Sequence, residues 1–143
     1  MPNHKCYLYY SEVLLFTIII ILGLVWQGMT SAVQAQGGCP AIQNTPRFTI
    51  VYGAVTVNGQ LALAGTVVEA RTPITRGNSA VGCFEVSNPG DYGAMYVYGE
   101  DTSVTPSIPG MRLQETIAFY VNGVAAMGTP GLTWSNDKEV HQV

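Results

Sequence analysis

Short segments of alternating side chains, separated by turn-forming residues, run from about residue 48 to residue 143 and restrict the chain to a β-rich fold. Alternation places successive side chains on opposite faces of an extended strand, so each segment predicts a strand with an inward and an outward face. Two dipeptides, Asn58-Gly59 and Asn122-Gly123, predict tight hairpins because both residue types accept positive φ. We therefore expect an all-β fold, a two-layer antiparallel β-sandwich of about seven strands.

The individual strands can be placed from the same pattern. We expect longer strands at residues 48–57, 66–71, 81–86, 94–98 and 115–121, and shorter ones at 124–127, 132–134 and 139–143. The first strand is apolar on both faces at its start, so we expect that end to be covered on both sides. Its faces carry Thr49, Val51, Val55 and Val57 on one side, and Phe48, Ile50 and Tyr52 on the other. We expect no helix beyond residue 35.

An apolar run at residues 13–25, followed by Val33-Gln34-Ala35, has the form of an export signal. The run suits the core of a signal-peptide helix and is short for a membrane span, which needs roughly 20 apolar residues. We expect cleavage between Ala35 and Gln36, a leader at residues 36–47 and the β-domain at residues 48–143. The protein would then be secreted or held at the cell surface; in the alternative, residues 13–26 stay as an uncleaved membrane anchor.

The cysteines agree with export. Cys6 would leave with the signal, and Cys39 and Cys83 would remain as a pair. In an oxidising compartment such a pair predicts a disulfide. The alternative is that Cys83 is a small buried apolar residue and Cys39 a mobile thiol.

Charge excludes two classes of partner. The net charge is −3, and Lys138 is the one lysine after Lys5. Nucleic-acid binding needs clustered Lys and Arg, and docking on anionic lipid needs a basic patch. We expect neither, so the membrane is a partner only if the N-terminal segment is kept as an anchor.

Several stretches resemble the carboxypeptidase-regulatory-like, or transthyretin-like, β-sandwich modules of exported bacterial and archaeal surface proteins. They are residues 52–60 (YGAVTVNGQ), 64–70 (AGTVVEA), 82–84 (GCF), 91–93 (DYG) and 119–123 (FYVNG). One departure is Leu63, where these modules often have proline. The resemblance implies a sandwich of transthyretin-like or immunoglobulin-like type. It also implies a non-catalytic accessory role, structural or adhesive, with other surface proteins or glycans as partners.

Two acidic-polar pairs are candidates for a metal site. Glu100-Asp101 and Asn136-Asp137 would supply four oxygen-bearing side chains if the fold brought them to one end, and Ca²⁺ prefers such hard ligands. No Asp-x-Asp-x-Asp-Gly loop supports this. The favoured interpretation is that these are turn-forming, solvated side chains, so we expect no cofactor, with calcium as the alternative.

Aromatic residues offer a second kind of site. Tyr92, Tyr96, Tyr98 and Trp134 are candidates for a platform that stacks on sugar rings. The favoured interpretation is that alternate tyrosines bury their rings and leave their hydroxyls at the edge. Carbohydrate binding is nevertheless the best ligand hypothesis.

Catalysis is not expected. A reactive thiol needs a partly exposed, electropositive setting, whereas Cys83 lies in the middle of an expected strand. His141 is the one histidine after the signal, and no Gly-x-Ser-x-Gly turn surrounds any serine.

Overall fold

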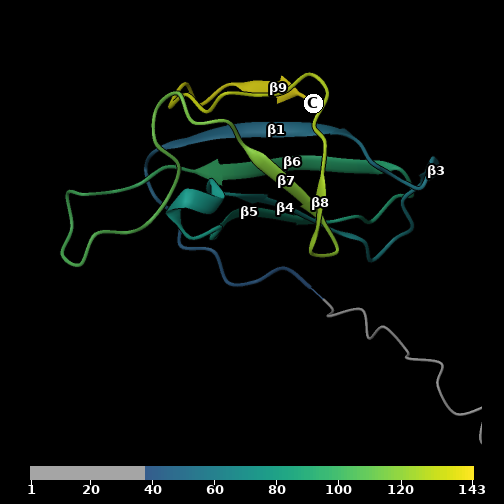
Figure 1. Ribbon diagram of the computed structural model, residues 1–143, viewed down its shortest axis with the longest axis horizontal. Coiled ribbons are helices and arrows are strands. Elements are labelled where there is room, and N and C mark those ends of the chain that lie inside the picture. The colour runs from purple at the N-terminus through teal and green to yellow at the C-terminus, as the bar shows by residue number, and fades with distance from the viewer. Residues whose placement is uncertain (1–37) are drawn as a thin grey trace, which may run out of the picture. The chain divides into compact units, whose positions relative to one another are not determined.

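The computed structural model describes residues 38–143, which form an all-β fold (Figure 1). One short 3₁₀ turn, η1 (Ile74–Arg76), interrupts the strands, and residues 38–143 contain no α-helix. Among these residues no helix is long and apolar enough to span a bilayer. The expected signal segment, anchor and cleavage point between Ala35 and Gln36 lie outside the described residues.

Nine strands within residues 38–143 form three sheets. One sheet has the order β6-β1-β9, a small one pairs β2 with β3, and the third has the order β5-β4-β7-β8. All pairings are antiparallel except that of β1 with β9, which is parallel. The strands are β1 (Phe48–Ala54), β2 (Thr56–Val57), β3 (Gln60–Leu61), β4 (Val67–Arg71), β5 (Ala80–Glu85), β6 (Asp91–Tyr98), β7 (Ala118–Val121), β8 (Val124–Ala126) and β9 (Val140–Gln142).

The two larger sheets contribute to one hydrophobic core. Their buried rows include Val51, Met95 and Val97 from β1 and β6, and Val68, Ala70 and Phe119 from β4 and β7. Strands β5 and β6 approach closely: a Cβ at Gly82 would lie 2.6 Å from the Tyr96 carbonyl oxygen. The prediction of an all-β, mostly antiparallel chain is therefore confirmed.

The expected single strand at residues 48–57 is wrong in its second half. The β1–β6 register shifts between Val51 and Gly53, and β1 ends at Ala54. Beyond Ala54 the chain forms a separate hairpin, in which β2 pairs with β3. Its turn is Asn58-Gly59, whose φ angles are 54° and 77°. Inward positions up to Val55 are buried as expected, but Val57 is 42% exposed because it belongs to this separate hairpin.

Other strand boundaries differ because side-chain pattern does not reveal register. β6 begins at Asp91, three residues before the expected start, and β7 begins at Ala118 instead of residue 115. Residues 132–134 do not form a strand but a single bridge between Thr116 and Thr133. The closing strand is present as β9, although its parallel pairing was not expected.

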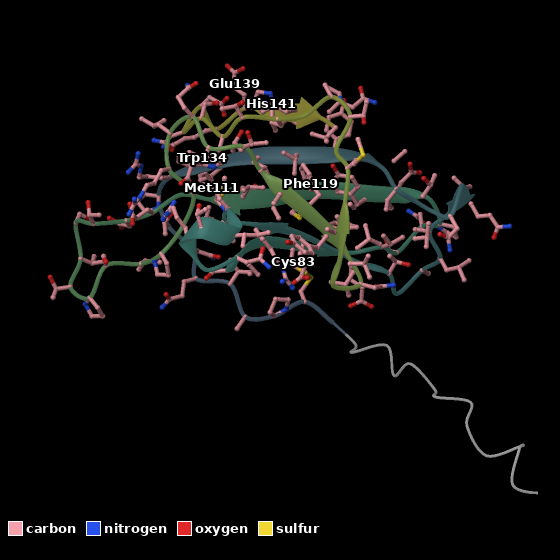
Figure 2. All side chains as sticks on the ribbon, in the orientation of Figure 1. Cys83, Met111, Phe119, Trp134, Glu139 and His141 are labelled. Carbon is pink, nitrogen blue, oxygen red and sulfur yellow. A yellow bond between two sulfur atoms is a disulfide. The ribbon has the colours of Figure 1, made fainter. Side chains whose placement is uncertain are left out.

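Trp134 anchors the end of β6 to the connections that follow it. Its side chain is fully buried, and its indole N–H donates a hydrogen bond to the Val97 carbonyl oxygen at 2.9 Å. Met111 is equally buried, and its backbone N–H donates to the Tyr98 carbonyl oxygen. Figure 2 shows both side chains in the interior at one end of β6. Gly99 faces the Trp134 ring so closely that a Cβ there would overlap it.

This contact predicts that Gly99→Ala destabilises the fold. Overpacking a close contact typically costs about 1–3 kcal/mol of unfolding free energy. The matched control is Gly131→Ala, because a Cβ at Gly131 meets no atom within 4 Å in the described structure. Urea unfolding followed by tryptophan fluorescence would measure both variants. Equal midpoints for the two variants would contradict the proposed packing.

The leader is joined to the third sheet by the Cys39–Cys83 disulfide, with the two Cα atoms 5.6 Å apart. The predicted bridge is thus confirmed, and the alternative of a mobile Cys39 thiol is wrong. Farther along the leader, Thr45 is buried and its hydroxyl donates to the Gly99 carbonyl oxygen at 2.9 Å. The bridge and this hydrogen bond hold the leader at two points.

We expect the double variant Cys39→Ser/Cys83→Ser to lose about 4 kcal/mol of unfolding free energy, the chain-entropy value for a loop of this length. The physical reason is the greater freedom of the unfolded chain without the bridge, which joins residues 44 positions apart. Urea unfolding with and without dithiothreitol would measure the loss. Reductant should lower the wild-type midpoint and leave the double variant unchanged.

Candidate functional site

The first calcium candidate, Glu100, belongs to a network of ion pairs. Arg112 donates two hydrogen bonds to it, at 2.8 and 2.9 Å, and Arg76 lies 3.6 Å away. Arg76 also pairs with Glu115 at 2.7 Å and donates to the Gly110 carbonyl oxygen. The hydrogen bond from Arg112, followed by the nearby arginine charges, holds the pKa of Glu100 below its usual range. The carboxylate therefore fastens the long connection between β6 and β7.

Asp101 has a local role in the same connection. Its carboxylate accepts hydrogen bonds from the Ser103 hydroxyl at 2.6 Å and from the Ser103 backbone N–H at 2.9 Å. These bonds lower the pKa of Asp101. Its backbone pairs with Ile108, which closes the base of a loop that projects from one end of the sheets (Figure 1, green).

The second pair of candidates, Asn136 and Asp137, organises the approach to β9. The Asn136 side-chain oxygen accepts a hydrogen bond from the Phe48 backbone N–H at 3.1 Å. Asp137 accepts four hydrogen bonds, from the side chains of Ser135, Thr49 and His141 and from the Glu139 backbone N–H. Partial burial alone would raise the pKa of Asp137, but these hydrogen bonds outweigh it and hold the pKa well below its usual range.

The acidic candidates are thus engaged with protein donors. Within residues 38–143, no three His, Cys, Asp or Glu side chains gather closely enough to hold a metal ion. His141 contacts Asp137 at 2.9 Å, and Cys83 is in the disulfide. Both residues therefore have structural contacts.

The candidate aromatic platform does not assemble from its four residues. Tyr92 and Trp134 are buried, at 5% and 0% exposure, so neither can present a ring to a ligand in solution. Burial raises the pKa of Tyr92 to about 12. The reason is the register shift in the β1–β6 pairing, which inserts one extra β6 residue and turns Tyr92 inward, to the side of Met95.

Tyr96 and Tyr98 instead lie on the outer surface of β6, opposite the buried Met95 and Val97. The alternation predicted the two opposite faces, but the favoured interpretation that these tyrosines bury their rings is wrong for Tyr96, which is exposed. Together with neighbours on β1 and β9 they form what we call the aromatic face. Its residues are Phe48, Ile50, Tyr52, Tyr96, Tyr98 and Val140. Three of them are substantially exposed: Tyr52 at 40%, Tyr96 at 44% and Val140 at 58%.

The rings of the aromatic face contact one another. Phe48 meets Tyr96 edge-on, with centroids 5.2 Å apart, and the Tyr96 and Tyr98 rings are nearly parallel at 6.1 Å. Lys138 places its ammonium nitrogen 5.8 Å from the Phe48 ring centroid. The sequence analysis named Tyr96 and Tyr98 as candidates but missed their neighbours on β1 and β9, because the outer residues of the first strand were expected to be covered. In residues 38–143 no further sheet covers them.

We expect Asp137→Asn to lower the melting temperature at neutral pH, since it weakens hydrogen bonds to a charged acceptor. A carboxyl whose pKa is lowered by folding stabilises above its unfolded pKa, near 4, and loses this effect as pH falls toward its folded pKa. The difference in melting temperature between wild type and variant should therefore be largest at pH 7 and smaller at pH 2.5. Circular dichroism melts at both pH values would measure it.

The control is Asp91→Asn, at an exposed position whose side chain makes no hydrogen bond in the described structure. A gap for Asp137→Asn that stays constant with pH would contradict the role of the ionised carboxylate.

Comparison with known proteins adds no relative: no family model, curated protein or solved structure matches this chain. The resemblance to transthyretin-like modules accordingly remains a hypothesis that rests on the sequence stretches quoted above. The structure supports the coarser part of it, an all-β fold of mostly antiparallel strands in three sheets.

Proposed function

We propose that this chain is a non-catalytic module of the cell surface or the secreted fraction, with an adhesive or structural role exerted through the aromatic face. The observation that carries the proposal is the exposure of Tyr52, Tyr96 and Val140 side by side on one sheet. Contiguous exposed apolar surface marks interaction sites on soluble proteins. Tyrosine is among the residues enriched at the energetic centres of interfaces.

The proposal includes a finer description of the fold. The two larger sheets would be the layers of a transthyretin-like or immunoglobulin-like β-sandwich, with the aromatic face as the outer surface of one layer. The shared core of both sheets and the glycine-rich sequence stretches support this description. The mixed sheet with parallel β9 is a variation within it.

Export is the second part of the proposal. The apolar run followed by Val33-Gln34-Ala35 supports a signal peptide, and the disulfide suits an oxidising compartment. A module exposed outside the cell can use its aromatic face against other surface proteins.

A glycan partner is the alternative. The near-parallel rings of Tyr96 and Tyr98, with an interplanar angle of 16°, favour it because flat rings on one surface can stack against sugar rings. Their hydroxyl groups could also hydrogen-bond to sugar hydroxyls.

The double variant Tyr52→Ser/Tyr96→Ser tests the role of the aromatic face. We expect the purified protein to bind cell envelopes of its source organism, and the variant to bind at least tenfold more weakly, the effect of losing a hot-spot ring. Sedimentation of the envelopes with labelled protein would measure binding. The control is Leu63→Ser/Ile74→Ser, because these side chains are more exposed, at 73% and 77%, and lie outside the face.

Treatment of the envelopes separates the two kinds of partner. Loss of binding after protease treatment indicates a surface protein, and loss after glycosidase treatment indicates a glycan. Equal binding by both double variants, or no binding by wild type, would show that the face is not an adhesive surface.

A further inference from the structure

A groove opens between the two larger sheets, away from the aromatic face. Its volume is about 700 Å³, within the size range of protein ligand sites. Val68, Phe119 and Val121 line it from one sheet, and Tyr92 and the end of β1 line it from the other. The remaining lining comes from residues 126–130 and 142–143. None of the lining side chains is charged.

The inward side of β8 is exposed at this groove. Val124 and Ala126 lie opposite Val121 and Phe119 in the β7–β8 pairing, so they share the inward face with those residues. Phe119 is buried, yet Val124 is 69% exposed and Ala126 is also exposed. Within residues 38–143 nothing from the other sheet covers these two inward positions. The core is therefore open along this side.

The loop after β8 closes the groove at one end. A Cβ at Gly128 would lie 2.8 Å from the Val143 side chain and 2.9 Å from the Phe119 ring, so the backbone fits tightly there. Figure 1 shows this segment passing beside the C-terminal end of β9, and Figure 2 labels the buried Phe119 of β7. Met127, 93% exposed, stands at the rim.

The backbone of β8 offers a free edge beside the groove. The β7–β8 hairpin has a two-residue loop with positive φ at Asn122 and Gly123, so Val121 and Val124 form its first hydrogen-bonded pair. Along such a ladder alternate residues point their N–H and C=O groups to the partner strand, which leaves those of Ala125 pointing away from β7. β8 is the edge of its sheet in the described residues.

We propose that this edge and groove together bind an extended, uncharged segment of a partner polypeptide, which adds as a strand beside β8. Its backbone would pair with Ala125, and alternate apolar side chains would enter the groove next to Val124 and Ala126. An exposed edge is a template for strand addition, and side pockets select alternate side chains. The uncharged lining selects against charged residues at the inserted positions, since a buried unpaired charge is costly. This binding is independent of the aromatic face.

A displayed library of random nine-residue peptides, selected on the purified protein, provides the probe. We expect the enriched sequences to alternate apolar residues and to lack charge at those positions. Fluorescence anisotropy with an enriched synthetic peptide would measure affinity, and hydrogen exchange should show new protection of the Ala125 amide in the complex.

Two variants of β8 and a control elsewhere separate the two contacts. Ala126→Glu places a charge in the groove and should weaken peptide binding at least tenfold. Ala125→Pro removes the edge N–H, a substitution that edge strands tolerate, and should weaken it similarly. The control, Ile74→Glu, introduces the same charge at a side chain that is 77% exposed and lies outside the groove, and it should bind as wild type does. Circular dichroism melts would confirm that each variant is folded, with Met127→Glu replacing Ala126→Glu if the latter is not.

Other results would overturn the proposal. These are no enrichment, enrichment of charged sequences, or peptide binding that Ala126→Glu leaves unchanged. A wild-type dimer in sedimentation equilibrium that Ala126→Glu dissociates would assign the groove to a second copy. Binding of a fatty acid such as laurate that Ala126→Glu abolishes and Ala125→Pro preserves would assign it to an acyl chain.

Discussion

The burial of Trp134 against the end of β6 is the contact on which the arrangement of the two sheets depends. The indole occupies the space that Gly99 leaves open, and its N–H satisfies the Val97 carbonyl oxygen inside the core. The backbone of Trp134 also exchanges hydrogen bonds with Gln114 and Glu115, so one residue joins β6 to the segment that leads into β7. The connection between these strands is long and irregular. Without the indole its inner side would leave a void in the core.

Polar contacts also hold the long connection between β6 and β7 in place. Arg76 reaches from η1 to Glu115 and to the Gly110 carbonyl oxygen, and Arg112 turns back to Glu100. Partly exposed ion pairs are individually weak, but a network of four groups also restricts the loop's conformation. At the opposite side of β1, Asp137 arranges the turn before β9. Charged residues of this charge-poor chain are thus concentrated where irregular segments must be held.

Sequence reasoning succeeded where local pattern decides the outcome. Alternation correctly placed Tyr96 and Tyr98 on the face opposite Met95 and Val97, although it did not tell which face is buried, and the two cysteines predicted the bridge. It failed where register decides. Tyr92 and Tyr96 are four residues apart, so strict alternation would put both side chains on the same face. The extra β6 residue in the β1–β6 pairing turns Tyr92 inward. The contribution of β1 and β9 to the aromatic face was missed for a similar reason, because the side-chain pattern of a strand does not tell whether another sheet covers its outer side. Residues 132–134 were expected to form a short strand, but they form a single bridge at Thr133, and the pattern did not indicate that Trp134 packs against Gly99.

The pairing of β9 with β1 joins residues about ninety positions apart, Ile50 with Val140. Such a contact closes a large loop of chain, and topologies rich in distant pairings form slowly. During synthesis, β1 can therefore pair with β6 before β9 is available, so the edge of β1 that later pairs with β9 is exposed in that interval. Temporary exposure of this kind favours aggregation. If β9 pairs with β1 last, the yield of folded protein would depend on chaperones that protect this exposed edge.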